Sequence, residues 1–320
     1  MHEFELIKNY FSKLANKSKS SLNLNDDVFF DKNFKLVVSV DTYVEGKNFF
    51  NFKKPDLVIK KIIRSSISDL ICKGVKPKYY FLSASGNSKV FTKKNLTKIN
   101  QSLIEEQKIY NIILGGGDTV NSSKLSFTIT SVGFSKKIIY RNRSKVNDDI
   151  YVTGNIGDSF IGLIALKKKI NLNRKLSTYF INQYYKPKIE YSITDHLKKF
   201  ATSSIDLSDG LISDLEKLTN KQKNSYRLCL DKIPISKNLN LLLNIKNLVK
   251  KNVISNGDDY QILFTANIKH RSLIKKISSL KKIKITRIGK ILNSRLKSSI
   301  IDKNGRQIKI NNKGYIHTFD

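Results

Sequence analysis

The sequence predicts an α/β protein with two domains, each built around its own sheet. Segments with the apolar pattern of buried strands alternate with segments of helical periodicity along the whole chain. A length of 320 residues is enough for two hydrophobic cores of ordinary size. A polar and basic stretch at 136–149 interrupts the alternation, which restarts after it. We therefore expect an N-terminal domain at 1–138 and a C-terminal domain at 139–320.

The expected elements of the first domain follow from its apolar pattern. The helix at 55–72 has apolar residues at helical spacing, with Pro55 in its first turn and Gly74 as its C-terminal cap. The segment at 125–134 alternates apolar and polar residues, which indicates a strand with one exposed face. The remaining expected elements are an amphipathic helix at 1–14, strands at 35–41, 78–84 and 111–114, and a helix at 92–108.

The second domain is expected to begin with a strand at 149–154. A glycine-containing turn and a helix to about Lys169 follow it. A short apolar stretch ends in Asp206, before a helix with a leucine stripe on its inner side. Further strands are expected at 226–233, 260–266 and 283–289.

Composition argues against several classes of protein. No run of about 18 apolar residues occurs, so we expect no membrane span. The N-terminus carries Glu3 and Glu5 and lacks the features of a signal peptide. The two cysteines, Cys72 and Cys229, have neither metal-binding nor redox spacing around them, which is typical of a cytoplasmic protein.

The formal net charge of +33 is typical of nucleic-acid-binding proteins. The lysines, however, are spread along the whole chain, and no arginine-rich stripe or aromatic-plus-basic motif occurs. We interpret the charge as compositional background and expect no specific nucleic-acid partner. The alternative is a basic RNA-associated protein with an inactive nucleotide fold, which would bind nucleic acid with steep salt dependence and turn over no ATP.

The aspartates are more informative than the lysines, because Asp outnumbers Glu 19 to 7 and gathers in short motifs. Asp26 and Asp27 stand in a loop, where an ordinary turn is the alternative. Asp41 ends a buried strand, at the edge where ligands gather in open α/β sheets, although aspartate also caps strand ends. Asp69 lies on the helix at 55–72, and burying a carboxylate there is costly unless it meets a cation or donors.

Three further motifs combine carboxylates with turns. Three glycines precede Asp118 at 114–122, which lets a backbone approach a phosphate closely, although a tight turn is the alternative and no Walker A motif occurs. The segment at 203–218 contains Asp206, Asp209 and Asp214, of which Asp209 could cap the following helix, but capping does not explain all three together.

The last motif places Asp258 and Asp259 before a buried strand, where a hairpin turn is the alternative. Carboxylates gathered at strand ends repel one another unless divalent cations lie between them. Oxygen ligands without histidine or cysteine nearby select a hard ion, Mg²⁺ before Zn²⁺. The motifs together therefore predict an enzyme that holds Mg²⁺ against nucleotide phosphates.

In order and spacing, these motifs resemble those of thiamine-monophosphate kinases. The matching segments are NDDV, VDTYVEGKNF, SSISDLICKGVKP, GGGDT, IDLSDGLISDL, NGDDYQILF and the terminal NNKGYIHTF. This family belongs to the superfamily of aminoimidazole ribotide synthetase and selenophosphate synthetase. The resemblance runs over essentially the whole chain, and the IDLSDGLISDL and DTYVEG segments are specific to the family.

The resemblance implies an aminoimidazole ribotide synthetase-like fold, with an N-terminal mixed-sheet domain for ATP binding and homodimerisation and a C-terminal α/β domain. It implies transfer of the ATP γ-phosphoryl group to thiamine monophosphate, with several Mg²⁺ ions as cofactor. By matched position it implies metal ligands at Asp27, Ser39, Val40, Asp41, Asp69, Asp118, Asp206 and Asp209. It implies ATP contacts at Gly117, Asp118, Arg141 and Ser208, and thiamine phosphate contacts at Asn48, Asp258 and Tyr315. No catalytic residue separate from these ligands is implied.

The chain departs from the family pattern at four matched positions. Asn48 replaces a usual His, Asp258 a usual Glu, Ser66 a usual Asn, and Val40 a usual Thr. Asn48 has no titratable charge, Asp258 is shorter by one methylene, and Val40 offers only its carbonyl. An acceptor shifted to thiamine is one alternative. Another ATP-dependent synthetase of the superfamily is a second, against which the SDGLISDL and DTYVEG segments argue.

The expected acceptor needs no general base. The second pKa of a phosphate monoester is about 6, so the acceptor is mostly a dianion at neutral pH. Two like charges at about 4 Å repel by about 4 kcal/mol at an effective dielectric constant of about 20, and bridging cations remove that repulsion. We therefore expect direct transfer without a phosphorylated enzyme.

Overall fold

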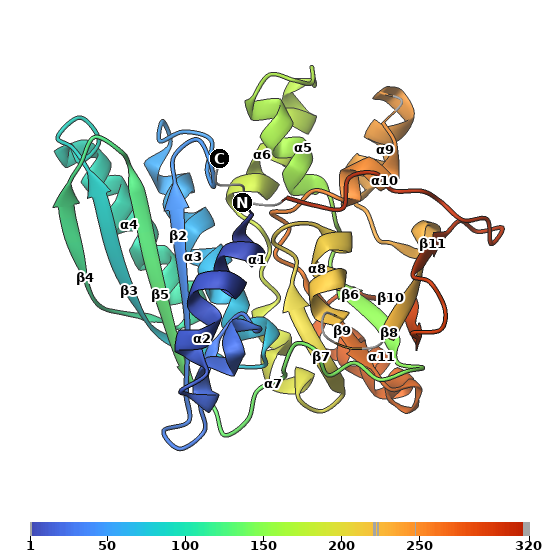
Figure 1. Ribbon diagram of the computed structural model, residues 1–320. Coiled ribbons are helices and arrows are strands. Elements are labelled where there is room, and N and C mark those ends of the chain that lie inside the picture. The colour runs from blue at the N-terminus through green and yellow to red at the C-terminus, as the bar shows by residue number, and fades with distance from the viewer. Residues whose placement is uncertain (1, 220–221, 223, 247, 316–320) are drawn as a thin grey trace.

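Two mixed sheets form the framework of the computed structural model, which describes residues 2–219, 222, 224–246 and 248–315 (Figure 1). The five-stranded sheet has the order β1-β2-β5-β3-β4, and the six-stranded sheet has the order β11-β8-β10-β6-β9-β7. The long helix α3 (Pro55–Cys72) packs against β2 and β5 of the first sheet and against β7 of the second. The predicted α/β fold class with two sheets is thus confirmed.

The five-stranded sheet is antiparallel except for the pair β3 and β4. Its strands are β1 (Phe29–Asp31), β2 (Leu36–Val44), β3 (Pro77–Gly86), β4 (Ile113–Asn121) and β5 (Ser126–Phe134). The helices α3 and α4 (Lys93–Tyr110) cover one face, and buried residues alternate with more exposed ones along β5. The predicted helix at 55–72 and the half-exposed strand at 125–134 are confirmed.

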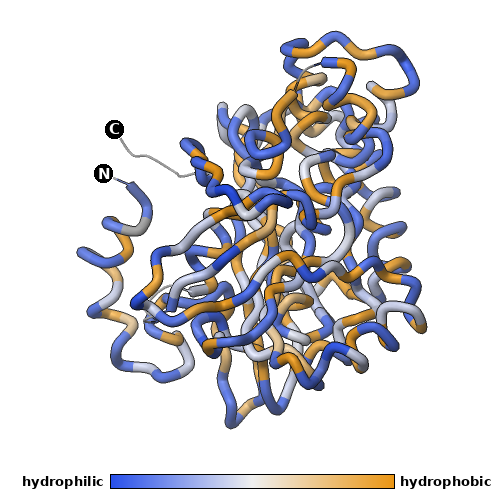
Figure 2. Tube along the Cα trace, turned by 90° about the vertical axis from the view of Figure 1, so that its right-hand side faces the viewer, coloured by the Kyte–Doolittle hydropathy of each residue, from blue (hydrophilic) through white to orange (hydrophobic). Residues whose placement is uncertain are grey.

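The N-terminal segment is helical but irregular. It consists of α1 (Glu3–Leu6), a π-helical turn (Ile7–Phe11) and α2 (Ser12–Ala15), and a 3₁₀ helix (Lys19–Leu24) follows. Hydrophobic and hydrophilic residues alternate along this segment, which lies at one side of the molecule (Figure 2). The predicted amphipathic helix at 1–14 is therefore confirmed in its described part, with a π-helical interruption that the sequence pattern did not indicate.

The six-stranded sheet carries the second half of the chain. Its strands are β6 (Asp149–Thr153), β7 (Ala201–Asp206), β8 (Asn224–Cys229), β9 (Ile262–Ala266), β10 (Ile285–Asn293) and β11 (Ser299–Ile301). Its helices are α5 (Asp158–Leu166), α6 (Arg174–Tyr185), α7 (Thr194–Leu197), α8 (Leu211–Thr219), α9 (Lys237–Lys246), α10 (Lys250–Ile254) and α11 (Arg271–Lys281). The pair β8 and β11 is parallel, and the other pairs are antiparallel.

Left-handed residues explain why several predicted boundaries were wrong. The helix after β6 ends at Leu166 rather than near Lys169, because Lys168 adopts φ +56°. The strand at 260–266 begins only at Ile262, because Tyr260 adopts φ +50°. The strand expected at 226–233 ends at Cys229, where a 3₁₀ turn begins. The strand expected at 111–114 runs from Ile113 to Asn121, because its glycines pair with β3.

One hydrophobic cluster connects the two sheets. It includes Phe127 from β5, Tyr184 from α6 and Phe264 from β9, and α3 contributes buried isoleucines to it. Because α3 is packed on both sides, even its polar residues Lys61 and Ser68 are buried. No helix among the described residues is long and apolar enough to cross a membrane.

Candidate active site between the two sheets

Three predicted metal ligands meet where α3 passes between the sheets. Asp41 lies on β2, Asp69 on α3 and Asp206 at the end of β7. The Ser39 hydroxyl donates to Asp69 Oδ2, and Ser68 Oγ donates to Asp206 Oδ2 at 2.5 Å. Ser39 of β2 thus connects the first sheet to Asp69 of α3, and Ser68 of α3 connects that helix to Asp206 of the second sheet.

Burial and mutual repulsion raise the pKa of each carboxyl in this cluster. Desolvation, followed by the charge of Asp27, raises the pKa of Asp41 to about 7 and that of Asp206 to about 8. The pKa of Asp69 is raised well above its usual value by desolvation and then by Asp41 and Asp206. Asp206 is buried and Asp41 and Asp69 are half-buried, and carboxylates this close in such surroundings are stable as anions only if a cation compensates them.

Lys73 supplies one such cation beside the cluster. Its fully buried Nζ lies 2.7 Å from Asp26 Oδ1 and 2.6 Å from Asp27 Oδ2, and donates to the Ser204 carbonyl at 2.8 Å. The Arg141 Nη1 lies 3.0 Å from Asp27 Oδ1. Burial raises the pKa of Asp27, but Lys73 and then Arg141 outweigh it and lower that pKa to about 2. Asp27 is therefore ionised at neutral pH.

The donor set fits a hard divalent cation. Its atoms are carboxylate and hydroxyl oxygens, which Mg²⁺ prefers over nitrogen or sulfur. Asp27 Oδ2 is buried and accepts no hydrogen bond of good geometry, although the Lys73 ammonium is close to it. In the part of the chain that the structure describes, no three acidic, histidine or cysteine side chains converge as a ready-made metal site. The carboxylates would therefore have to close around a cation by small side-chain movements.

Four other predicted site residues meet in a second group of loops. The Asp258 amide donates to the Ser208 carbonyl at 2.9 Å, and the Tyr315 amide donates to the Asp209 carbonyl at 2.9 Å. The carboxylate of Asp209 forms an ion pair with Lys217. Predicted ATP, metal and substrate residues thus share one loop junction. The rest of the terminal motif, 316–319, lies outside the described residues.

The turn before α8 is capped by an aspartate other than the expected one. Asp214 Oδ2 accepts hydrogen bonds from the amides of Asp209 and Gly210, at 3.0 and 3.1 Å. Its other oxygen lies 3.0 Å from Lys217 Nζ. The side chain of Asp209 is therefore not needed for capping, which leaves it to Lys217 or to a ligand.

Lys61 connects the substrate-side loop to α3. Its Nζ lies 2.7 Å from Asp258 Oδ1 and 4.0 Å from the centre of the Tyr184 ring. The Tyr260 hydroxyl donates to the same carboxylate oxygen at 2.9 Å. The sequence did not single out Lys61 or Lys73, because lysine is abundant throughout. The one signal was that both stand next to apolar positions of a helix expected to be buried.

Four predicted residues do not join the aspartate cluster. Asp118 and Gly117 lie on β4, an exposed edge strand, and β5 and β3 separate β4 from β2. At about 4.8 Å per strand, Asp118 stands about 14 Å from Asp41 along the sheet. The Val40 side chain points away from α3 and is 61% exposed. Asn48 Oδ1 accepts the Val44 amide at 3.0 Å within its own turn.

Comparison with known proteins identifies the family. Residues 25–135 match the family model described as AIR synthase related protein, N-terminal domain. The thiamine-monophosphate kinase of Buchnera aphidicola from Acyrthosiphon pisum is 34% identical over 98% of both chains. The chain belongs to the thiamine-monophosphate kinases. It is accordingly an enzyme, a kinase that uses ATP. The Bacillus subtilis thiamine-monophosphate kinase is 28% identical over 99% of both chains.

Solved structures support the fold. The structure described as AaThiL complexed with AMPPCP and TMP has a TM-score of 0.86 at 23% identity, covering 99% of this chain and 97% of that one. The thiamine monophosphate kinase from Aquifex aeolicus has a TM-score of 0.79 at 22% identity, covering 96% and 99%. The predicted aminoimidazole ribotide synthetase-like fold is therefore confirmed.

Proposed function

We propose that this thiamine-monophosphate kinase transfers the γ-phosphoryl group of ATP directly to thiamine monophosphate beside the cluster of Asp27, Asp41, Asp69 and Asp206. The observation that supports this site most strongly is that carboxylates from both sheets lie around α3, with the pKa values of Asp41, Asp69 and Asp206 raised by desolvation and then by neighbouring carboxylates. Burying several carboxylates of like charge costs free energy, so their presence here indicates a function for the cluster. The site lies where the proposed N-terminal part, 1–138, meets the proposed C-terminal part, 139–320.

Mg²⁺ ions are the proposed cofactor of this cluster. Asp27, Asp41, Asp69 and Asp206 would hold them, with oxygens from Ser39, the Val40 carbonyl and Asp209 completing the set. Bound there, the ions would neutralise phosphate charge and favour the loose transition state of phosphoryl transfer. The protein's own part is to keep these carboxylates together, desolvated and oriented by Ser39 and Ser68.

The chain's own cations complement the metal ligands. Arg141 donates through Nε to the Asn25 carbonyl at 3.1 Å and through its amide to Asp26 Oδ2 at 2.9 Å, which fixes the loop of Asp27. We propose that this guanidinium turns part of its donor fork to ATP phosphates. Gly117, Asp118 and Ser208 are the other proposed ATP contacts.

The acceptor is proposed to contact Asn48, Asp258 and Tyr315. Thiamine carries a positively charged thiazolium ring, and the Asp258 carboxylate keeps 25% of its side chain exposed. Lys61 and Tyr260 hold that carboxylate in place. Because the phosphate acceptor is already ionised, these residues need to position it rather than deprotonate it.

This assignment predicts the acceptor. With ATP and Mg²⁺, thiamine monophosphate should support ADP release, and thiamine should support at least about a hundredfold less, because only the phosphorylated acceptor presents an anionic nucleophile to the cluster. A coupled ADP assay with the two acceptors side by side measures this, and product analysis should show thiamine diphosphate. Equal or greater turnover with thiamine would overturn the proposed acceptor.

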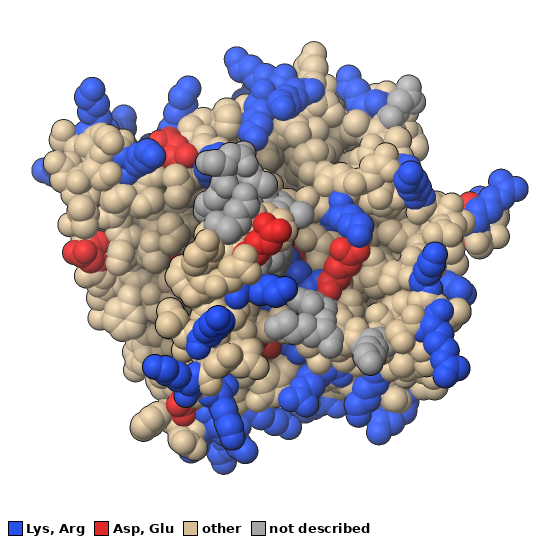
Figure 3. Space-filling view, viewed as in Figure 1, with Lys and Arg blue, Asp and Glu red and all other residues tan. Residues whose placement is uncertain are grey.

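The open face of the five-stranded sheet is the proposed dimer surface. It carries the exposed apolar side chains Val40, Phe81 and Phe134. The surface over β3, β4 and β5 shows almost no lysine or arginine, whereas many lysine and arginine side chains project from the rest of the visible face (Figure 3). An apolar patch with almost no lysine or arginine on so basic a chain is typical of a protein–protein interface, and a second copy is the proposed occupant.

A dimer through this surface also explains the place of Asp118. Since Asp118 cannot reach the cluster of its own chain, we propose that it completes the site of the second protomer. Mixing Asp69→Asn protein with Asp118→Asn protein should then restore about a quarter of wild-type activity, because half of the dimers are mixed and each has one intact site. The two variants alone should be inactive. No recovery after subunit exchange, checked by native mass spectrometry, would place both residues in one chain.

A further inference from the structure

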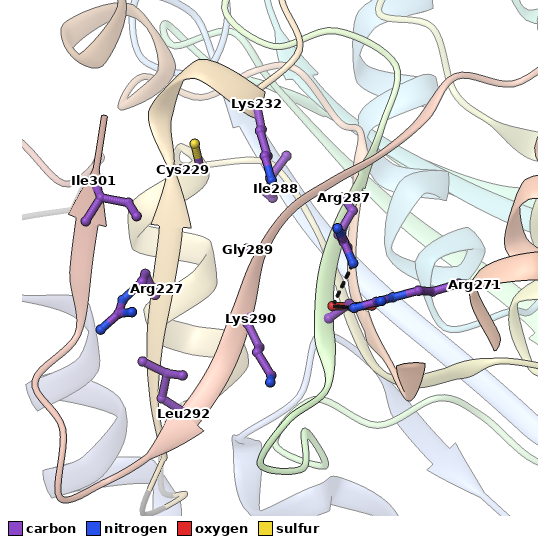
Figure 4. Close-up of a pocket in the computed structure, with 11 residues that line it drawn as sticks. Arg227, Cys229, Lys232, Arg271, Arg287, Ile288, Gly289, Lys290, Leu292 and Ile301 are labelled. Carbon is purple, nitrogen blue, oxygen red and sulfur yellow. Dashed lines mark hydrogen bonds and ion pairs between the residues drawn. The ribbon is translucent and has the colours of Figure 1, made fainter. Parts of the chain in front are cut away.

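A basic pocket lies on the six-stranded sheet, at the edge remote from Asp206 (Figure 4). The cavity has a volume of about 280 Å³ and is formed by β8, β10 and β11 together with the start of α11. Five cationic side chains line it, against one carboxylate, Asp149: these are Arg227, Lys232, Arg271, Arg287 and Lys290. Neither the aspartate cluster nor the loops of the proposed acceptor site contribute to it.

Strand register places two of these cations opposite each other on neighbouring strands of the sheet. Arg227 on β8 stands directly opposite Lys290 on β10, and Lys290 stands opposite Asp149 on β6. Figure 4 shows the two side chains on these neighbouring strands, with Arg227 directed toward β11 and Lys290 directed away from it. Like charges directly opposite each other destabilise an antiparallel pair. Both residues line the same cavity, so an anion bound in it would offset this repulsion.

The one carboxylate of the pocket is already engaged. Arg271 binds Asp149 with two hydrogen bonds, Nε to Oδ2 at 2.6 Å and Nη2 to Oδ1 at 2.9 Å, and Arg287 Nη1 lies 3.6 Å from Oδ1. Within the described ranges, the side chains of Arg227, Lys232 and Lys290 have no such partner. Three positive charges are therefore left to face the cavity.

The geometry points to a binding site for a small organic phosphate. Arginine presents a planar fork of donors that matches phosphate oxygens, and lysine adds a point charge. Leu292 and Ile301 give the same cavity an apolar wall for a ring or sugar. RNA is the less suitable ligand, because no aromatic side chain lines the pocket for base stacking. We use adenosine 5′-monophosphate as the probe. Inorganic pyrophosphate, which has phosphate charge but no ring or sugar, shows how much of the binding comes from the phosphate alone.

Cys229 offers a reporter inside the pocket. It is a free, half-buried cysteine that lines the cavity, whereas the other cysteine, Cys72, is buried in the core. We would measure by mass spectrometry how fast an uncharged thiol reagent modifies Cys229. EDTA keeps the aspartate cluster free of metal, so that phosphate binding there does not contribute. Adenosine monophosphate should slow the modification of Cys229 at least about fivefold at saturation, and pyrophosphate should do so at higher concentration.

The variant R227Q/K290Q tests the residues. It should bind the probe at least about tenfold more weakly, since two charge-assisted contacts are lost. A control variant that neutralises the exposed run Lys167, Lys168 and Lys169 removes more charge elsewhere and should leave protection unchanged. Thermal unfolding shows whether each variant is folded. Absence of protection at millimolar probe, equal protection in both variants, or protection only by RNA with steep salt dependence would each overturn the proposal.

Discussion

The substitution Asp69→Asn should abolish phosphoryl transfer while leaving the protein folded. Asp69 sits between Asp41 and Asp206, so its loss removes the carboxylate that connects the ligands of the two sheets. Turnover with ATP and thiamine monophosphate should fall by about a thousandfold or more, because metal-dependent charge stabilisation contributes several kcal/mol to such reactions. The coupled ADP assay at saturating Mg²⁺ measures the loss.

Stability measurements separate this effect from misfolding. Without metal, Asp69→Asn should unfold at a higher temperature than the wild type, because it removes one of several crowded buried carboxylates. Asp195→Asn is the matched control, since Asp195 is 62% exposed and pairs with Lys76 at the surface. Near-normal activity of Asp69→Asn would show that the carboxylate does not hold the metal.

Lys73→Met should strongly destabilise the metal-free protein. Methionine keeps a similar length and volume but leaves the carboxylates of Asp26 and Asp27 without their buried ammonium. Breaking a buried ion pair from one side costs about 3–5 kcal/mol, and denaturant unfolding in EDTA should show a loss of that size. Mg²⁺ should restore part of it, because a cation at Asp27 would take over the role of Lys73.

Lys76→Met is the control for that experiment. Lys76 lies three residues further along the chain, is 44% exposed and pairs with exposed Asp195, so its loss should change stability by less than about 1 kcal/mol. If Lys73→Met were equally stable with and without Mg²⁺, the buried ammonium would have no connection with the metal site.

Local chemistry made much of the fold predictable. The bounds of α3 followed from Pro55, the spacing of its isoleucines and Gly74, which adopts the positive φ of +73° that ends the helix. Asp69 stood out because a carboxylate in such a helix needs a partner. Two of the wrong boundaries share one cause: Lys168 and Tyr260 adopt left-handed conformations that neither residue type indicates.

Contacts between residues far apart in the sequence limited how much of the site could be predicted. Lys73 and Lys61 reach Asp27 and Asp258 across the fold, and their place beside apolar helix positions is the only local feature that distinguishes them from the other lysines of this basic chain. The motif of Asp118 was recognisable, but its distance from Asp41 depends on strand order, which the sequence pattern does not contain. The order of the motifs thus predicted which aspartates are candidate metal ligands. The ion pairs that hold Asp27 and Asp258 in place could be identified only in the structure.

The pH dependence of the metal-free protein follows from the raised pKa values. Asp41 and Asp206 have folded pKa values of about 7 and about 8, against an ordinary value of 3.8. Their protonation stabilises the fold fully below the ordinary value, and that stabilisation is lost as pH rises through 7 and 8. Asp27, with its pKa of about 2, does not titrate in this window. At a pH below these pKa values, a divalent cation would have to displace the protons bound to Asp41 and Asp206.

Calorimetric titration of the metal-free enzyme with Mg²⁺ at several pH values tests the central claim, that the aspartate cluster is the metal site. Mg²⁺ binding should tighten by about tenfold or more between pH 6 and pH 9, protons should be released on binding at the lower pH, and both effects should be lost in Asp69→Asn. Binding with the same affinity at every pH, without proton release and unchanged in Asp69→Asn, would contradict it.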